Sequence, residues 1–437
     1  MCEIVQVVEE PLKNIENDCQ GMKLDDILVA PEANLSDMPV EIILKICSFL
    51  DSHFLKYTLS QVCTRFQDIL ADDHLWKYWV QSKTNGCYPT LPNLRVWKQE
   101  PFDWEDICVE IDSEKTKWTN MESTVRHVIV KDVHYASVDA VLLVNKGQMC
   151  FSGGRDRSLA QWTIKDLTQQ NDFKPSRIRL DAHSGWVWDL AANSVDNASV
   201  VYSASWDNTV KAWDITSGLE CIQSFSCGMA ALSLVASDNL LMAGLYNNKV
   251  LAFDVRAGPN HIQSYRPNKG AILAMSMYKN MVASVSNSKN LTIWDQTAGK
   301  FLHRCLKIPI ATQEYYASCI SWNSSALYVG DSMGSLHLFN PEDFTYIRTH
   351  SLWVPSKLLN ESHKMVGCHQ TKGNMVVGSN RGEIKFFYNC NPPHEYCTIT
   401  TDTIDVTKLQ YQNGVLAVGS CDTALEFWIP KEKNDAV

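Results

Sequence analysis

The chain has 437 residues, enough for about two or three domains, and its 49 acidic residues outnumber 39 basic ones, giving a formal net charge of −10. This balance and the lack of a long basic run argue against nucleic acid as the main partner, and the apolar runs are too short to cross a membrane. The 15 cysteines are scattered without a C-x-x-C pair, so we expect neither a metal site nor disulfides, and the absence of a signal peptide predicts a cytoplasmic or nuclear location, or both.

The two ends of the chain are charged. Residues 1–34 contain eight Asp or Glu side chains against Lys13 and Lys23. Such a segment buries too little apolar surface to offset the entropy of ordering, so we expect an acidic, disordered N-terminal segment. Residues 431–437 are expected to form a charged, solvated tail.

Residues 35–80 predict two or three short helices with more apolar surface than they need. In the first helix only Glu41, Lys45 and Ser48 form a polar face, so the apolar arc is much wider than the ~100° stripe of an ordinary surface helix. A unit of this size rarely buries a self-sufficient core. We therefore expect the surplus apolar surface to be buried on another protein.

Residues 81–122 are expected to be a helical linker. Glycine and prolines break the chain early, and a helix is then predicted from its cap, Asp103, through Trp118. One face of this helix is apolar and contains Trp104, Ile107, Ile111 and Trp118. A flexible tether would be polar and rich in glycine and serine, so we expect a packed spacer instead.

From residue 123 onward the chain repeats one unit. An aromatic residue closes each copy, at Trp162, Trp213, Phe253, Trp294, Phe339, Phe387 and Trp428. The steps between them are 51, 40, 41, 45, 48 and 41 residues, close to the ~40–45-residue period of propeller blades. Apolar residues alternate between these positions, which predicts antiparallel strands. We therefore expect seven blades within residues 123–430.

Four residues of the second unit are expected to form one buried hydrogen-bonded chain: His183, Ser203, Asp207 and Trp213. Paired in this way, they should satisfy one another in the core rather than catalyse a reaction. The first and seventh units keep the turn aspartate, as Asp156 and Asp422. The second unit is the only one in which we identify all four residues.

The two ends of the repeat region are expected to meet. Few residues follow Trp428, so the seventh unit lacks an outer strand. Residues 124–130 alternate like a strand and belong to no unit of their own. We predict that they pair with residues 425–429, which would close the ring and protect an exposed edge.

Both regions resemble known families. The motif at the front resembles an F-box, matched in order and spacing by Leu35, Met38-Pro39, Glu41-Ile42-Ile43, Ile46, Phe49-Leu50, Val62-Cys63, Arg65-Phe66 and Leu75-Trp76. The second repeat, with its His…Ser-x-x-x-Asp-x5-Trp spacing, resembles a WD repeat. Residues 35–429 together resemble the F-box/WD-repeat family. This implies an α+β multidomain fold, with a small helical F-box at 35–80, the linker at 81–122 and an all-β seven-bladed WD-repeat propeller at 123–430.

The resemblance implies a non-catalytic substrate-recognition subunit of a Skp–cullin–F-box ubiquitin ligase. The F-box would dock on the Skp adaptor, and through it on a cullin, while the propeller would bind the protein to be ubiquitinated; no cofactor is implied. Adaptor contacts are expected among Met38, Pro39, Ile42, Ile43, Ile46, Leu50, Val62, Cys63, Phe66, Leu75 and Trp76. Several of these must instead pack inside the F-box, because a small helical unit still needs a core.

Substrate contacts are expected on the loops at one face of the propeller. The repeat positions that face this surface are Trp186, Trp188 and Trp206 in the second unit and Asp139 and Arg155 in the first. The tryptophans would form an apolar anchor, although Trp186 or Trp188 could instead pack between blades. Loop arginines could bind a phosphorylated or acidic segment, but the repeats contain no clear arginine pattern.

Two other classes of function are weighed against the ligase subunit. One is a WD-repeat scaffold outside the ubiquitin pathway that keeps an F-box-like helical unit for another assembly. The other is an enzyme, which has little support because the sequence contains no P-loop, no G-x-S-x-G, no H-E-x-x-H and no metal-ligand spacing.

Overall fold

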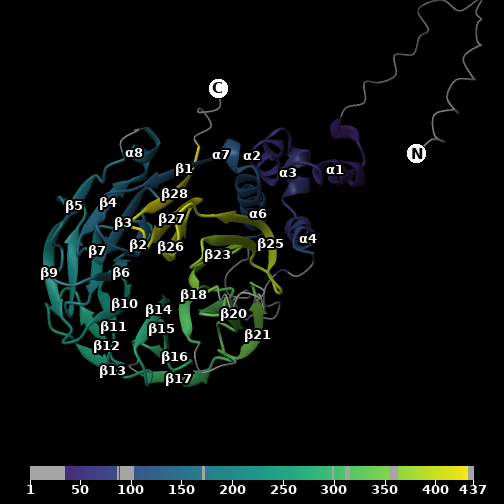
Figure 1. Cartoon of the computed structure of the whole chain (residues 1–437). Helices are drawn as coiled ribbons and strands as arrows, with labels where there is room; N and C mark the ends of the chain where they lie inside the picture. Colours follow the sequence, from purple (N-terminus) through teal and green to yellow (C-terminus); the bar gives the residue numbers. More distant parts are fainter. Residues whose placement is uncertain are drawn as a thin grey trace, which may run out of the picture.

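A computed structural model describes residues 35–85, 88, 103–169, 173–297, 300–310, 315–353 and 363–431. The acidic segment 1–34 and residues 432–437 of the tail lie outside this range, as does the Pro-containing part of the linker. The described chain forms a helical unit beside a ring of β-sheets (Figure 1), which confirms the predicted fold class. No helix in this part of the chain is both long enough and apolar enough to span a membrane.

The helical unit contains four α-helices, one more than the upper limit predicted. They are α1 (Val40–Cys47), α2 (Ser52–Tyr57), α3 (Thr64–Leu70) and α4 (Asp73–Lys83), with 3-10 turns η2 (Leu35–Asp37) and η3 (Leu59–Gln61). The Asp51 side chain accepts hydrogen bonds from the backbone N–H groups of His53 and Phe54, and Asp72 accepts one from His74. These two caps start α2 and α4 and divide the segment more finely than the apolar pattern indicates.

The helical unit has a buried core of its own. Its members include Ile43, Cys47, Leu55, Phe66, Leu70, Trp76, Trp79 and Val80. Trp76 Nε1 donates to the carbonyl of Leu70 at 2.7 Å, which ties α4 to the end of α3. Arg65 on α3 donates to the carbonyl of Met38 at 2.7 Å and so fixes the segment that precedes α1.

Helix α6 (Trp104–Thr119) confirms the predicted helix in the linker and its cap. The Asp103 side chain accepts a hydrogen bond from the backbone N–H of Asp106 at 2.9 Å. Ile107, Cys108 and Ile111 are buried in the same apolar core as the helical unit, and this core continues into Tyr388 and Cys390 of the ring. In Figure 1, α6 lies between α1–α4 and the sheet that contains β25. The linker helix is therefore a packed spacer, as predicted.

Polar contacts reinforce this packing on both sides of α6. Toward the helical unit, the Lys83 ammonium lies 2.5 Å from a carboxylate oxygen of Asp112, which also accepts from the Ser52 backbone at 3.2 Å. Toward the ring, Glu110 accepts hydrogen bonds from the Gly373 backbone and the Asn374 side chain, each at 3.1 Å. The spacer is thus bonded to both of its neighbours.

The ring is a propeller of seven four-stranded antiparallel sheets, as the repeat spacing predicts. Blade 1 contains β2 (Val138–Val144), β3 (Met149–Gly154), β4 (Leu159–Thr163) and β5 (Arg177–Arg179). Blade 2 contains β6 (Val187–Ala192), β7 (Val200–Ser205), β8 (Thr209–Asp214) and β9 (Glu220–Ser226). Blade 3 contains β10 (Ala231–Ala236), β11 (Leu240–Leu245), β12 (Val250–Asp254) and β13 (Gln263–Tyr265). Blade 4 contains β14 (Ile272–Tyr278), β15 (Met281–Ser286), β16 (Asn290–Asp295) and β17 (Lys300–Lys307). Blade 5 contains β18 (Ala317–Trp322), β19 (Leu327–Asp331), β20 (Ser335–Phe339) and β21 (Tyr346–Ser351). Blade 6 is β22 (Met365–Gln370), β23 (Asn374–Ser379), β24 (Glu383–Tyr388) and β25 (His394–Thr400). A short helix, α8 (Ile164–Gln169), interrupts blade 1.

Blade 7 closes the ring with strands from both ends of the repeat region. It contains β26 (Val406–Gln412), β27 (Val415–Ser420), β28 (Leu425–Pro430) and, as its outer strand, β1 (Val125–Val130), which follows the turn of helix α7 (Met121–Thr124). Strand β1 pairs antiparallel with β28, with His127 opposite Trp428. The predicted closure is confirmed: β28 lies between β27 and β1, so its edge is covered, and β1 becomes the outer strand of the blade.

The hydrogen-bonded chain predicted for blade 2 is present. The His183 ring lies 2.8 Å from Asp207 Oδ2 and 2.7 Å from Ser203 Oγ, and Trp213 Nε1 donates to the same hydroxyl at 2.8 Å.

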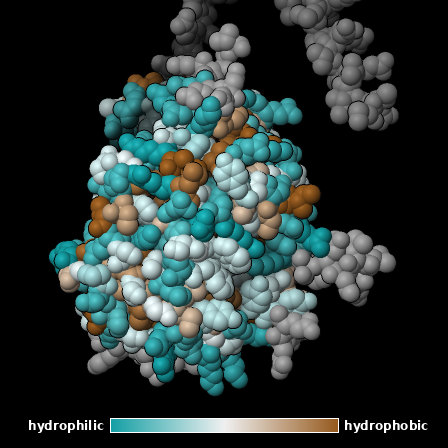
Figure 2. Space-filling model, turned by 60° about the vertical axis from the view of Figure 1, so that its left-hand side comes forward, coloured by the Kyte–Doolittle hydropathy of each residue, from teal (hydrophilic) through white to brown (hydrophobic). Residues whose placement is uncertain are grey.

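On the face shown in Figure 2, apolar residues form small separate groups among hydrophilic ones, consistent with cores that lie between the sheets.

The expectation that only the second unit contains all four residues is wrong. In blade 1, His134 lies 2.9 Å from Asp156 Oδ2 and 2.8 Å from Ser152 Oγ, and Trp162 Nε1 donates to Ser152 at 2.9 Å. The histidine and aspartate are 22 residues apart in blade 1 and 24 apart in blade 2, because the intervening segment is shorter. The shared Ser-x-x-x-Asp-x5-Trp spacing was the usable signal.

We expect Asp156→Asn to lower the free energy of unfolding at neutral pH by about 2 kcal/mol. Burial alone would raise the pKa of Asp156, but hydrogen bonds from His134 and Ser158 outweigh it and hold this pKa at about 2, below the ordinary 3.8. The contribution of the carboxylate is therefore complete above pH 3.8 and is lost as the pH falls toward 2. Urea unfolding at several pH values tests this, with the exposed Asp422→Asn as control. Equal losses for both variants would contradict it.

Candidate protein-binding sites

The helical unit exposes an apolar surface around α1. Of the sequence-predicted adaptor contacts, Pro39, Ile42 and Ile46 are exposed at and along α1, with 47% of the Ile42 surface accessible. Val62, which follows η3, is also exposed, with 64% of its surface accessible. Ile42 and Ile46 are four residues apart, so they lie on one side of the helix. Met38, Leu50, Cys63 and Leu75 are half-buried against the core. This surface is available to another protein.

Three of the predicted adaptor contacts lie inside the unit instead. Ile43, Phe66 and Trp76 are buried at 2%, 4% and 1% exposure in the core that α1, α3 and α4 share. Such a division of the set was predicted, but the sequence does not indicate which residues fall on which side. Both flanks of α1 are apolar, and periodicity does not indicate which flank faces the neighbouring helices.

Sequence reasoning missed several exposed aromatic residues of the same unit. Phe49, directly after α1, is 77% exposed, and the others are Phe54, Tyr57 and Tyr78. Phe49 matches the F-box pattern, which was a usable signal, and it continues the exposed side formed by Ile42 and Ile46. Large apolar side chains that gather on one surface mark an interaction site more often than scattered ones do.

The second candidate site is the mouth of the central channel of the propeller. Each inner strand contains one β-bulge, at the same place in every blade. The extra residues are Asp139, Trp188, Leu232, Leu273, Ser318, Val366 and Thr407, and all of them line one cavity of about 510 Å³. A bulge redirects a side chain that regular pleating would place elsewhere. We call this cavity the channel mouth.

The five residues predicted for substrate binding meet at one side of this mouth. Arg155 Nε donates to Asp139 Oδ2 at 2.8 Å and its Nη2 donates to Oδ1 at 3.3 Å. The Arg155 guanidinium lies 5.0 Å from the ring centroid of Trp186 and 5.9 Å from that of Trp188. The centroid of Trp206 lies 5.7 Å from each of these rings.

Tyr246 is an additional member of this group that sequence reasoning missed. Its ring centroid lies 5.9 Å from that of Trp206, and 56% of its surface is exposed. Tyr246 precedes the turn residue of blade 3 as Trp206 precedes that of blade 2, so repeat alignment was a usable signal. We call Trp186, Trp188, Trp206 and Tyr246 the aromatic cluster.

The three tryptophans differ in how far the propeller covers them. Trp188 is half-buried and packs on the small core formed by Ala230, Leu232 and Ala271, as the alternative of packing between blades suggests. Trp186 and Trp206 keep 42% and 37% of their surface exposed. In the aromatic cluster, Trp188 is therefore packed against the protein, whereas Trp186 and Trp206 are accessible to a ligand.

The polar side chains in the channel below the mouth are bonded to other protein groups or uncharged. Lys408 Nζ lies 2.9 Å from Asp189 Oδ1, and the ring of His369 donates to the carbonyl of Leu409 at 2.9 Å. Burial lowers the pKa of His369 to about 4, so the ring is neutral at pH 7. Burial also raises the pKa of the Cys319 thiol to about 12, which removes its nucleophilic thiolate form.

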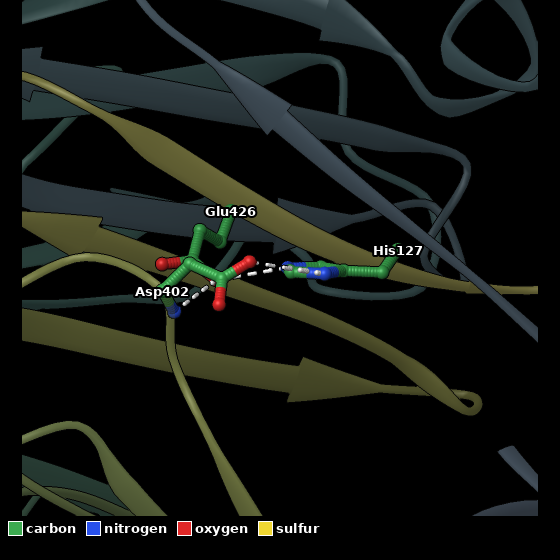
Figure 3. Close-up of side chains that lie close together, drawn as sticks. All are labelled: His127, Asp402 and Glu426. Atoms are coloured by element: carbon green, nitrogen blue, oxygen red, sulfur yellow. Dashed lines mark hydrogen bonds and ion pairs between the residues drawn. The ribbon is translucent and has the colours of Figure 1, made fainter.

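One group of side chains in the described chain places three possible metal-ligand atoms within 4.8 Å: His127, Asp402 and Glu426 (Figure 3). Glu426 is fully buried, and its carboxylate already accepts hydrogen bonds from the backbone N–H groups of Thr403 (2.6 Å) and Asp402 (3.2 Å). Its Oε2 also lies 2.8 Å from His127 Nε2. Protein groups thus bind both carboxylate oxygens of Glu426. The three side chains are best explained as a polar contact that holds β1 on β28.

Comparison with known proteins finds both regions. A family model described as F-box-like matches residues 35–82, and one described as WD domain, G-beta repeat matches residues 174–214. The chain is 28% identical over 403 residues to the Homo sapiens F-box/WD repeat-containing protein 9, covering 91% of this chain and 83% of that protein. It is 24% identical over 422 residues to the Caenorhabditis elegans F-box/WD repeat-containing protein mec-15, covering 93% and 98%.

Proposed function

We propose, from the membership of this chain in the F-box/WD-repeat family, that it is a non-catalytic substrate-recognition subunit of a Skp–cullin–F-box ubiquitin ligase. In this proposal the F-box docks on the Skp adaptor, and through it on a cullin. The propeller holds the protein to be ubiquitinated. The observation that carries the proposal is the apolar surface that α1 exposes although the F-box already has a core.

The exposed α1 surface supports docking on a protein. Ile42, Ile46, Phe49 and Val62 remain in water while Ile43 and Cys47 fill the inner side of the same helix. Burying such a side chain completely is worth about 1.5–3 kcal/mol relative to leaving it exposed. A partner that covered several of them would bind through the mode in which an amphipathic helix docks by its apolar face.

The spacer supports the ligase subunit over a scaffold outside the pathway. Helix α6 shares one core with the F-box and with blade 6, and it is bonded to both. Ubiquitin transfer requires a substrate lysine to be held near a second enzyme, and a rigid connection raises its effective concentration there. A scaffold that only gathers partners has no such need for a fixed distance.

The test is binding of the purified full-length chain to purified Skp adaptor. We expect the wild type to bind and the Ile42→Asp/Ile46→Asp variant to bind at least about 100-fold more weakly, because two carboxylates would have to be buried at the interface. Both residues are exposed in the free protein, so the variant should fold, which circular dichroism checks.

The matched control is Ile222→Asp/Ile262→Asp, which places the same changes on exposed isoleucines of the propeller, 56% and 59% exposed. This variant should bind the adaptor like the wild type. If the wild-type protein failed to bind the adaptor, the scaffold function would become the better explanation.

A further inference from the structure

Two of the three basic side chains that line the channel mouth are paired with carboxylates of the protein. The basic residues that line it are Arg155, Lys364 and Lys408. Arg155 forms a two-bond ion pair with Asp139, and its pKa is raised, chiefly by the hydrogen bond to that carboxylate. Lys408 is paired with Asp189 at 2.9 Å. These contacts leave little positive charge for a ligand.

The third basic residue does not change this balance. The ammonium of Lys364 lies 5.6 Å from the ring centroid of Tyr316, and Asp405 lines the same cavity. The three positive side chains are therefore balanced by Asp139 and Asp405, which line the mouth, and by Asp189, which lies outside the lining and is paired with Lys408. Two loop arginines outside the lining, Arg157 and Arg256, are also paired, with Asp181 and Asp254 at 3.4 Å each. Phosphate recognition uses clustered arginines that are free to form bidentate bonds.

The aromatic side of the mouth provides a different kind of surface. Trp188, Leu232 and Leu273 line the mouth with apolar surface. The ring of Trp206 lies beside that of Trp188 and the ring of Tyr246 beside that of Trp206, and both residues are exposed. The ion pair with Asp139 holds the Arg155 guanidinium against Trp186 and Trp188, so these rings are oriented before any ligand arrives. Rigid aromatic groups beside half-buried apolar surface are typical of binding hot spots.

We propose that the channel mouth binds an unmodified segment of a partner protein through a bulky apolar side chain, aromatic or long aliphatic, placed on the aromatic cluster. Phosphorylation of the segment is not required. The mouth is neutral overall, so it complements an uncharged side chain and gains nothing from a phosphate. This inference rests on the proposed function, because the segment would belong to the protein that is ubiquitinated.

The experiment begins with a random peptide library displayed on phage, which contains no phosphate, selected on the full-length protein. We expect enrichment of peptides with Phe, Trp or Leu at one position. Synthetic versions should bind at least about tenfold more weakly to Trp206→Ala and to Tyr246→Ala. Tyr246→Ala protects the test against misfolding, because this side chain is 56% exposed.

The matched control is Tyr135→Ala, an aromatic residue with 78% exposure in the loop before β2 and outside the aromatic cluster, which should leave affinity unchanged. A phosphoserine beside the apolar position should not tighten binding. Affinity should change by less than about threefold when the salt concentration is raised from about 50 to about 500 mM, because the positive and negative side chains around the mouth are equal in number and their effects on a ligand largely cancel.

The proposal would be overturned if selection enriched acidic peptides, if none were enriched, if both cluster variants bound normally, or if the phosphoserine tightened binding tenfold. These outcomes leave the ligase function standing as long as Trp206→Ala still binds the Skp adaptor. Conversely, loss of adaptor binding by the wild type would remove the ligase function without affecting peptide selection.

Discussion

Replacing Trp118 by alanine should lower the free energy of unfolding by about 4 kcal/mol, in the range measured for buried tryptophans. Trp118 is 1% exposed near the end of α6, and its ring is stacked on Phe386 of β24 at 4.2 Å between centroids. Tyr411 of β26 lies 6.1 Å away, and Cys397 of β25 donates its thiol to the Trp118 carbonyl. The substitution would leave a cavity between the spacer and blades 6 and 7.

Chemical unfolding followed by circular dichroism measures this loss. Trp104→Ala is the matched control, because Trp104 is only half-buried at the start of the same helix. It should cost about half as much or less. Small-angle scattering of Trp118→Ala should also show a wider range of distances between F-box and propeller. A loss no larger than that of Trp104→Ala would indicate that α6 does not depend on this contact.

The propeller could be predicted because its signals are local and repeated. The aromatic residues that close the units occupy the third strand of each sheet, and Trp162, Trp213 and Trp294 are almost completely buried there. A regular period constrains every blade at once, so weak copies are recognised by their position. The missed chain in blade 1 shows the limit: when a loop changes length, His134 moves off the expected spacing although its contacts are unchanged.

The binding sites were harder to predict because they depend on which neighbour covers a side chain. Ile42 and Ile43 are adjacent and equally apolar, yet one is 47% exposed and the other 2%. Only the positions of α3 and α4 decide between them. The β-bulges that direct Trp188 and Leu232 into the channel mouth present the same difficulty. A bulge arises from the pairing of two strands, so the sequence of one strand does not indicate it.

Replacing Glu426 by alanine should lower the free energy of unfolding by about 3–5 kcal/mol, because it removes a buried, charged hydrogen-bond acceptor at the closure of the ring. The change would leave the backbone donors of Asp402 and Thr403 and the ring of His127 without their acceptor. His127 also stacks on Trp428 at 4.5 Å, so β1 would lose a polar and a packing restraint together.

The same carboxylate predicts a dependence on pH. Burial alone would raise the pKa of Glu426, but hydrogen bonds from His127, Thr403 and Asp402 outweigh it and lower the pKa below the ordinary 4.5. Its stabilising contribution is therefore complete above pH 4.5 and is lost as the pH falls through the lower value in the folded protein. The difference in unfolding free energy between wild type and Glu426→Gln should shrink between pH 5 and pH 3.

Asp402→Ala provides the matched control within the same group (Figure 3). The Asp402 side chain is 69% exposed and its carboxylate lies 3.8 Å from the His127 ring, so its removal should change stability by less than about 1 kcal/mol. Urea unfolding of the three variants beside the wild type separates the two carboxylates. If Glu426→Ala unfolded no more readily than Asp402→Ala, strand pairing alone would hold the ring closed, because β1 would then need no buried acceptor to stay on β28.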